Sequence, residues 1–106
     1  MEQENMMDMD AFRHITDNPI ILDFTGCKTE WDVHDILKEK FGFPGYYGKN
    51  LDALWDCIRG GMGYPVTVQI KGLGTLPKAM EEEMAGILRI FQRVHDQTPE
   101  FTYEIV

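Results

Sequence analysis

The stretch PGYYGKNLDALWDC, residues 44–57, joins a loop rich in glycine and tyrosine to the start of an amphipathic helix. Asn50 is a favourable N-cap residue, so we expect a helix from Leu51 to about Arg59. Gly60 is expected to end it, because glycine is common just past a helix C-terminus. The segment therefore predicts a loop followed by a short helix with a defined beginning and end.

The predicted helix has an apolar side and an acidic side. At about 100° per residue, its apolar side carries Leu51, Leu54, Trp55 and Ile58. Asp52 and Asp56 share a face that points away from this side. Asp52 lies in the first turn, where the helix dipole stabilises an acid, so it is either a helix-start residue or a binding residue. Asp56 lies one turn later, where no local rule favours aspartate, and it is the better candidate for contact with another molecule.

Hydrophobic patterns on both sides of this segment predict an alternation of strands and helices. The expected strands are residues 20–24, 66–70 and 101–106, and the further helices are residues 30–41 and 76 or 78 to 97. On the last of these helices one apolar stripe is expected, made of Met80, Met84, Ile87, Leu88, Phe91 and Val94. Connections of this length join parallel strands. The sequence therefore predicts an α/β fold in which a three-stranded parallel sheet is packed with three to four helices.

Local signals sharpen two of these elements. Thr29 is expected to cap the helix at 30–41, with Asp32 suited to its first turn, and Gly42 is expected to end it. The run at residues 20–24 is almost continuously apolar. Such a run is typical of a strand that is covered on both faces.

Length and composition fit one compact domain of 106 residues, 43% hydrophobic and 26% charged. No apolar run reaches the roughly 18 residues of a membrane span, and the acidic start MEQENMMDMD does not suit a secretory signal. We therefore expect a cytoplasmic protein without a membrane segment. Residues 1–17, acidic and rich in methionine, are expected to form an arm outside a domain at residues 18–106.

The net charge of −8, from 18 acidic and 10 basic residues, disfavours a general nucleic-acid binder. Cys27 and Cys57 are expected to be free thiols in a reducing cytosol, with a disulfide as the alternative. The histidines, His14, His34 and His95, make no metal-ligand spacing with the cysteines and are each expected at the surface or the edge of the core. No metal or cofactor is implied.

The two loop tyrosines leave two interpretations open. Tyr46 and Tyr47 either fold back onto the core as loop anchors or form a contact surface, because tyrosine supplies a large area at low entropy cost. Gly45 and Gly48 shape the loop, but no GK[ST] sequence follows and the loop does not leave a strand directly. The loop is therefore not predicted to hold phosphate.

The same residues, with Tyr64 and Pro65 further on, closely resemble the barstar family, the intracellular inhibitors of the secreted bacterial ribonuclease barnase. The resemblance covers about residues 19–106, is sharpest over 44–65, and leaves 1–17 outside. It implies a three-stranded parallel sheet with helices, and a loop and second helix that plug the ribonuclease active site. It also implies a cis peptide at Tyr64–Pro65, and Cys57 matches a family cysteine whereas Cys27 does not.

Carried over residue by residue, the resemblance implies a role for each part of this surface. Tyr46 would lie over the guanine-recognition region, and Asp52 and Asp56 would face the cationic residues that hold RNA phosphate. Asp56 would be the main anchor. Asn50 and Trp55 would mainly support the loop and the helix.

The chain departs from the family at two places. Gly61 stands where family members can carry an aromatic residue, and Arg93, with Gln97 nearby, stands where they can place acids. A positive Arg93 would repel a basic cleft unless the partner offers an acid there. Alternatively, Arg93 pairs with Asp96 or Gln97 on its own surface. These departures predict a different cognate ribonuclease, or weaker binding to barnase-like enzymes.

The sequence thus predicts a monomeric inhibitor, not an enzyme, of a basic, extracellular-type, guanyl-preferring ribonuclease. The predicted partner-binding residues are Tyr46, Asn50, Asp52, Trp55, Asp56, Gly60, Gly61 and Arg93. Three alternatives stay open. The first is an enzyme that uses the two aspartates as an acid–base pair, although no His or Cys–His arrangement is evident to serve them. The second is a barstar-like module whose partner is not a nuclease. The third is a structural domain with no contact role.

Overall fold

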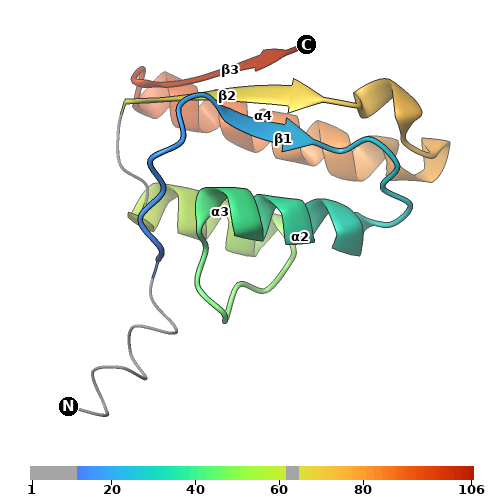
Figure 1. The fold of residues 1–106 in the computed structure, drawn as a ribbon, viewed down its shortest axis with the longest axis horizontal. Coiled ribbons are helices and arrows are strands. Elements are labelled where there is room, and N and C mark those ends of the chain that lie inside the picture. The colour runs from blue at the N-terminus through green and yellow to red at the C-terminus, as the bar shows by residue number, and fades with distance from the viewer. Residues whose placement is uncertain (1–11, 62–64) are drawn as a thin grey trace.

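The computed structural model describes residues 12–61 and 65–106, which form a parallel three-stranded sheet and the helices packed on it (Figure 1). The strands are β1 (Ile20–Asp23), β2 (Val66–Lys71) and β3 (Phe101–Ile105), and the helices are α2 (Glu30–Phe41), α3 (Leu51–Gly61) and α4 (Glu81–Gln97). Two single-turn 3₁₀ helices, η1 (Leu73–Thr75) and η2 (Lys78–Met80), precede α4. The predicted order of elements and the α/β class are confirmed.

The sheet has the order β1-β2-β3, with both neighbouring pairs parallel. Val68 lies at its centre, opposite Ile20 on one side and Tyr103 on the other. Both connections between strands pass through helices, α2 and α3 between β1 and β2 and α4 between β2 and β3, because parallel neighbours cannot be joined by a tight hairpin.

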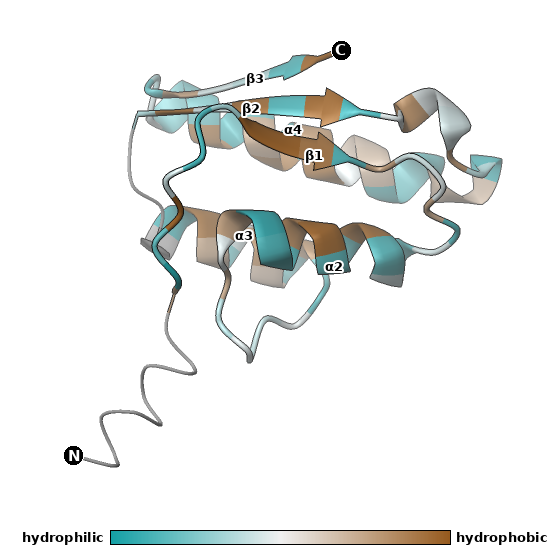
Figure 2. Ribbon diagram, viewed as in Figure 1, coloured by the Kyte–Doolittle hydropathy of each residue, from teal (hydrophilic) through white to brown (hydrophobic). Residues whose placement is uncertain are grey.

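Helices cover only one face of this sheet, so the prediction that the first strand is covered on both faces is wrong. Ile20 and Leu22 are buried, whereas Ile21 between them is 39% exposed. The open face carries polar pairs instead: the hydroxyl oxygens of Thr67 and Thr102 lie 3.0 Å apart, and Gln69 donates to Glu104 at 2.9 Å. Figure 2 shows the resulting alternation of hydrophobic and hydrophilic residues along β2.

The core lies between the sheet and the helices. The apolar stripe predicted on the last helix is confirmed, with Met84, Ile87, Phe91 and Val94 buried. Leu88 from that stripe is half-buried, and Ile90 is buried although the stripe did not include it. Ile90 is buried because it lies where α4 contacts α3. The periodicity of a single helix does not reveal which residues a second helix will cover.

Both ends of α2 follow their predicted chemistry. The Thr29 side chain accepts a hydrogen bond from the backbone N–H of Asp32, and the Asp32 carboxylate accepts from the backbone N–H of Thr29. This reciprocal capping box, together with the N–H of Lys28, lowers the pKa of Asp32. At the other end, Gly42 takes the left-handed conformation with φ 71°.

Residues 12–17, the described part of the expected arm, pack on this end of α2. The Phe12 ring lies edge-on to Phe43 with centroids 6.0 Å apart. The Arg13 backbone N–H donates to the Gly42 carbonyl at 2.9 Å, and its guanidinium donates to the Glu39 carbonyl at 3.0 Å. The domain's contacts therefore begin no later than Phe12.

Three further expectations concern single features. Cys27 and Cys57 are free thiols, and burial raises the pKa of both. The Tyr64–Pro65 peptide includes residue 64, which lies outside the described residues. Among the described helices, none has the length and apolar character needed to cross a bilayer.

We expect Gly42→Ala to lower the free energy of unfolding more than Gly26→Ala does. Both glycines have a positive φ, 71° and 81°, so each substitution costs about 1 kcal/mol from the left-handed backbone alone. Only at residue 42 would the new Cβ lie 2.7 Å from the Arg13 carbonyl oxygen, whereas nothing lies within 4 Å at residue 26. Urea unfolding measures both. Equal losses would show that residues 13–15 do not press on the end of α2.

Candidate protein-binding site

The tyrosine loop is held from beneath by a chain of buried hydrogen bonds. The Tyr47 hydroxyl lies 2.6 Å from His34 Nδ1, and His34 Nε2 lies 2.7 Å from Glu83 Oε2. Burial raises the pKa of the Tyr47 phenol, which keeps its proton available for donation to His34. The ring can then donate from Nε2 to the carboxylate. The loop is therefore tied to α2 and, through His34, to α4.

The expectation that His34 lies at the surface or the edge of the core is wrong, since its side chain is fully buried. His34 lies on the buried face of α2 with Val33 and Leu37. A buried imidazole is tolerated only if both nitrogens have partners. Those partners are distant along the chain, since Tyr47 is separated from His34 by 13 positions and Glu83 by 49 positions. The local sequence around His34 therefore did not reveal them.

The adjacent tyrosines point in opposite directions. Tyr47 is 5% exposed and packs against Phe43 with ring centroids 4.8 Å apart, so it is the loop anchor. Tyr46 is 69% exposed and is free to form a contact surface. Tyr47 therefore follows the loop-anchor interpretation, whereas the contact surface at Tyr46 stays a prediction.

A second attachment holds the loop where α3 begins. Lys49 Nζ lies 2.6 Å from Asp35 Oδ1 on α2 and 5.9 Å from the centre of the Trp31 ring. Lys49 also has a positive φ of 54°. Exposed ion pairs contribute little stability on their own, but this one fixes the loop at a turn that a lysine seldom adopts.

Asn50 caps α3, as predicted. Its Oδ1 accepts from the Ala53 backbone N–H at 2.8 Å, and its Nδ2 donates to the Gly48 carbonyl at 3.3 Å. The side chain thus connects the loop to the first turn of the helix. Leu54 and Ile58 are fully buried and fix the rotation of α3 on the core.

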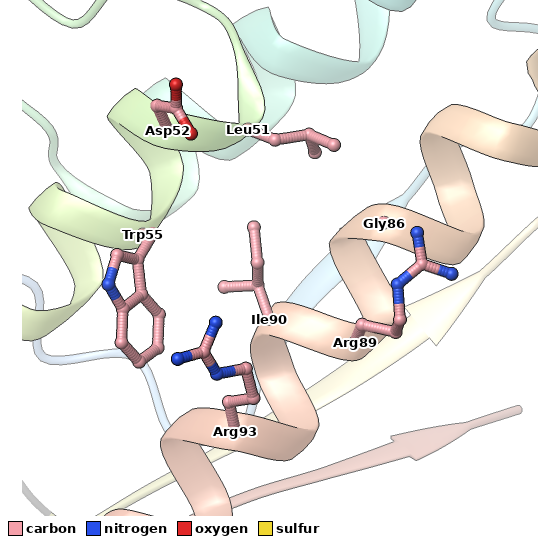
Figure 3. Close-up of a pocket in the computed structure, with 7 residues that line it drawn as sticks. All are labelled: Leu51, Asp52, Trp55, Gly86, Arg89, Ile90 and Arg93. Carbon is pink, nitrogen blue, oxygen red and sulfur yellow. The ribbon is translucent and has the colours of Figure 1, made fainter.

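Asp52 and Asp56 are both exposed and point away from the core, as the helical periodicity predicted. Within residues 12–61 and 65–106, neither carboxylate pairs with a lysine or an arginine of this chain. Figure 3 shows the Asp52 carboxylate on α3 apart from the guanidinium groups of Arg89 and Arg93 on α4. Two adjacent carboxylates without internal partners are available to a cationic surface.

Trp55 separates these acids from a group of arginines. The ring is half-buried, with the guanidinium of Arg93 4.5 Å and that of Arg59 5.1 Å from its centre. Arg93 therefore stacks on Trp55 and does not pair with Asp96, which accepts a hydrogen bond from Gln92. Such stacking leaves the edge of the guanidinium open to other acceptors.

Gly60 and Gly61 are the last two residues of α3, which continues past its expected end at Arg59. Sequence reasoning also missed Arg59 and Arg89 as neighbours of this surface. Arg89 and Arg93 are four residues apart and so share a face of α4, a signal that the sequence contained. Only the packing of α4 beside α3 shows that this face meets Trp55.

Nothing in the described ranges assembles a catalytic or metal centre around the aspartates. No group of three His, Cys, Asp or Glu side chains there could hold a metal ion. Asp52 and Asp56 are exposed, whereas general acid–base catalysis needs burial or a neighbour to adjust the carboxyl pKa. Burial and the Asp56 charge raise the pKa of the Cys57 thiol, which disfavours the thiolate.

Fold and surface together define a class of protein: a small parallel α/β domain with an exposed loop tyrosine and an acidic helix face. The family model described as Barstar (barnase inhibitor) matches residues 18–105, and the chain belongs to this family. It is similar to a Bacillus subtilis (strain 168) protein named "Putative ribonuclease inhibitor YrdF". The two are 35% identical over 78 residues, which cover 74% of this chain and 86% of that protein.

We expect Tyr47→Phe to destabilise the protein by about 1–3 kcal/mol, because it leaves His34 Nδ1 buried without a partner. Tyr46→Phe removes the same hydroxyl from an exposed ring and should change the free energy of unfolding by less than about 0.5 kcal/mol. Urea unfolding of the two variants compares them directly. Equal effects would mean that the buried chain does not hold the loop.

Proposed function

We propose that the protein inhibits a barnase-like, guanyl-preferring ribonuclease by filling its active site with the acidic face of α3 and the Tyr46 loop. Membership of the barstar family supports an inhibitory, non-enzymatic role. The name of the Bacillus subtilis relative also refers to a ribonuclease inhibitor. The observation that carries the proposal is the pair of exposed carboxylates on α3, Asp52 and Asp56, which have no ion-pair partner among the described residues.

The proposed mechanism is electrostatic mimicry of RNA. A cleft that binds an RNA backbone is lined with cations, and acids held opposite it accelerate encounter and exclude substrate. Asp56 is assigned as the main anchor, in the place of a substrate phosphate, with Asp52 one turn away. Tyr46 covers the guanine-recognition region with a large side chain of low entropy cost.

Pre-organisation makes this use of the carboxylates effective. The loop is fixed through Tyr47, Lys49 and Asn50, so little ordering remains to be done on binding. We assign the inhibitor to the cytoplasm, as a monomer that protects the producing cell from a secreted basic ribonuclease.

The proposal predicts a charge-specific loss of inhibition. Asp56→Asn should raise the Kd for a guanyl-preferring ribonuclease by at least about 30-fold, since truncating one partner of a buried charge pair costs about 2–5 kcal/mol. This range of free energies comes in part from measurements on the barnase–barstar complex, whose inhibitor belongs to the same family. Asp52→Asn should have a smaller effect. Association rates from stopped-flow mixing should fall as salt is raised, because the steering charges are screened.

The matched control is Glu104→Gln, which removes the same charge from the open face of the sheet. It should leave the Kd within about twofold. Equal effects of Asp56→Asn and Glu104→Gln would mean that only net charge matters. If a panel of such ribonucleases is not inhibited, the partner should be captured from the native cell and tested for RNA cleavage. A captured partner that does not cleave RNA would favour the non-nuclease module.

A further inference from the structure

A groove of about 280 Å³ runs between α3 and α4 beside the proposed binding face (Figure 3). Its walls are Leu51 and Trp55 from α3 and Ile90 from α4, so much of its lining is apolar. At Gly86 the two helices approach closely, since a Cβ there would lie 2.5 Å from Leu51 Cδ1. Asp52 lies at the same groove, which makes it continuous with the acidic face.

Arginines concentrate at this groove to an extent that the composition does not predict. The chain has 18 acidic residues and only four arginines, yet three of the four, Arg59, Arg89 and Arg93, lie in the groove or on Trp55. Arg89 and Arg93 are one turn apart on α4, a spacing at which like charges repel. A stability argument alone would not place them together.

These arginines also lack carboxylate partners within the described part of the chain. Arg59 and Arg93 contact the Trp55 ring, and Arg89 has no ion pair or hydrogen bond there. Asp52 lines the same groove, but its carboxylate lies apart from the guanidinium groups of Arg89 and Arg93 (Figure 3). The cations of this groove are therefore as available to an outside group as the neighbouring acids are.

The chemistry of the groove favours a carboxylate. A guanidinium presents parallel N–H donors that match two carboxylate oxygens, and stacking on an aromatic ring holds it in one plane. The apolar walls exclude water from such a pair and strengthen it. A polyanion such as RNA is disfavoured, because Asp52 and Asp56 lie alongside and the chain carries a net charge of −8.

We infer that the α3–α4 groove receives an aspartate or glutamate side chain of the ribonuclease partner, bound by Arg89 and Arg93 beside Trp55. The inference rests on the proposed function, because the same partner must dock on the acidic face of α3. It adds that the partner surface has mixed charge, basic opposite Asp52 and Asp56 and acidic opposite α4. A ribonuclease with a base at that place would be rejected by repulsion, so the groove selects among related enzymes.

The test uses whichever guanyl-preferring bacterial ribonuclease of the panel the wild-type protein inhibits most strongly. Arg89→Gln and Arg93→Gln should each raise its Kd at least tenfold, and Arg93→Glu should raise it further. Arg89→Lys, which keeps the charge but loses the fork, should fall between wild type and Arg89→Gln. Lys78→Glu on η2 is the control for charge reversal and should change the Kd by less than twofold.

The acid on the partner is located by changing each exposed Asp or Glu around the ribonuclease active site to its amide. One of them should show a non-additive effect with Arg89→Gln or Arg93→Gln in a double-mutant cycle. Because Arg93 stacks on Trp55, urea midpoints of all variants are measured. Arg89, unlike Arg93, has no aromatic contact among the described residues. The Arg89→Gln variant therefore keeps the inference testable if the Arg93 variants lose stability.

Distinct outcomes separate this inference from the proposed function. If Asp56→Asn weakens binding but both arginine variants change the Kd less than twofold, the groove inference is overturned and the proposed function stands. Tighter binding by Arg93→Glu would also overturn it, since the partner would then carry a base there. Binding of single-stranded RNA or inorganic phosphate to the free protein, lost in Arg89→Gln, would overturn it in favour of a free anion. If no ribonuclease of the panel binds the wild-type protein, the same variants are tested on the partner captured from the native cell, and a captured partner that does not cleave RNA would overturn both proposals.

Discussion

The hydrogen-bond chain from Tyr47 through His34 to Glu83 is the constraint on which the binding surface depends. It joins α2 and the loop that follows it to α4, which is 49 residues further along the chain at Glu83. Burying an imidazole without partners is costly, so any other position of the loop would carry that cost. The loop is therefore held in one conformation by the core itself.

The outward parts of the surface follow from that inward attachment. Because the Tyr47 side chain points into the core, the side chain of its neighbour Tyr46 is exposed. The same loop conformation places Asn50 at the start of α3, where its side chain caps the helix. Leu54 and Ile58 then fix the rotation of the helix, which directs Asp52 and Asp56 to solvent. The acids need no partner within the chain because the apolar side of α3 supplies the stability.

Acidic and basic side chains both lie near Trp55, and among the described residues they form no ion pair with each other. Asp52 and Asp56 are on α3 with Trp55, and the guanidinium groups of Arg59 from α3 and Arg93 from α4 lie over its ring. A surface that separates its charges in this way distinguishes partners by pattern as well as by net charge. Arg93, at which the chain departs from the family pattern, belongs to this arrangement because its guanidinium contacts the Trp55 ring.

The sequence by itself determined the helix caps, the acidic face of α3 and the order of the elements, all of which depend on short-range interactions. Capping by Thr29 and Asn50 and the acidic face of α3 follow from side chains within four residues of one another. Similarly, the order of strands and helices follows from local hydrophobic period. The family resemblance, which rests on one contiguous motif, was readable for the same reason.

Only the tertiary structure decided which of two equivalent local choices was taken. Nothing local distinguishes Tyr46 from Tyr47, or a strand covered on both faces from one with an exposed Ile21. His34 could be buried only because Glu83, 49 residues later, reaches its Nε2. The gathering of arginines at Trp55 likewise required α3 and α4 to pack side by side. In each case the deciding free energy lies in a contact between distant segments, which exists only once the chain has folded.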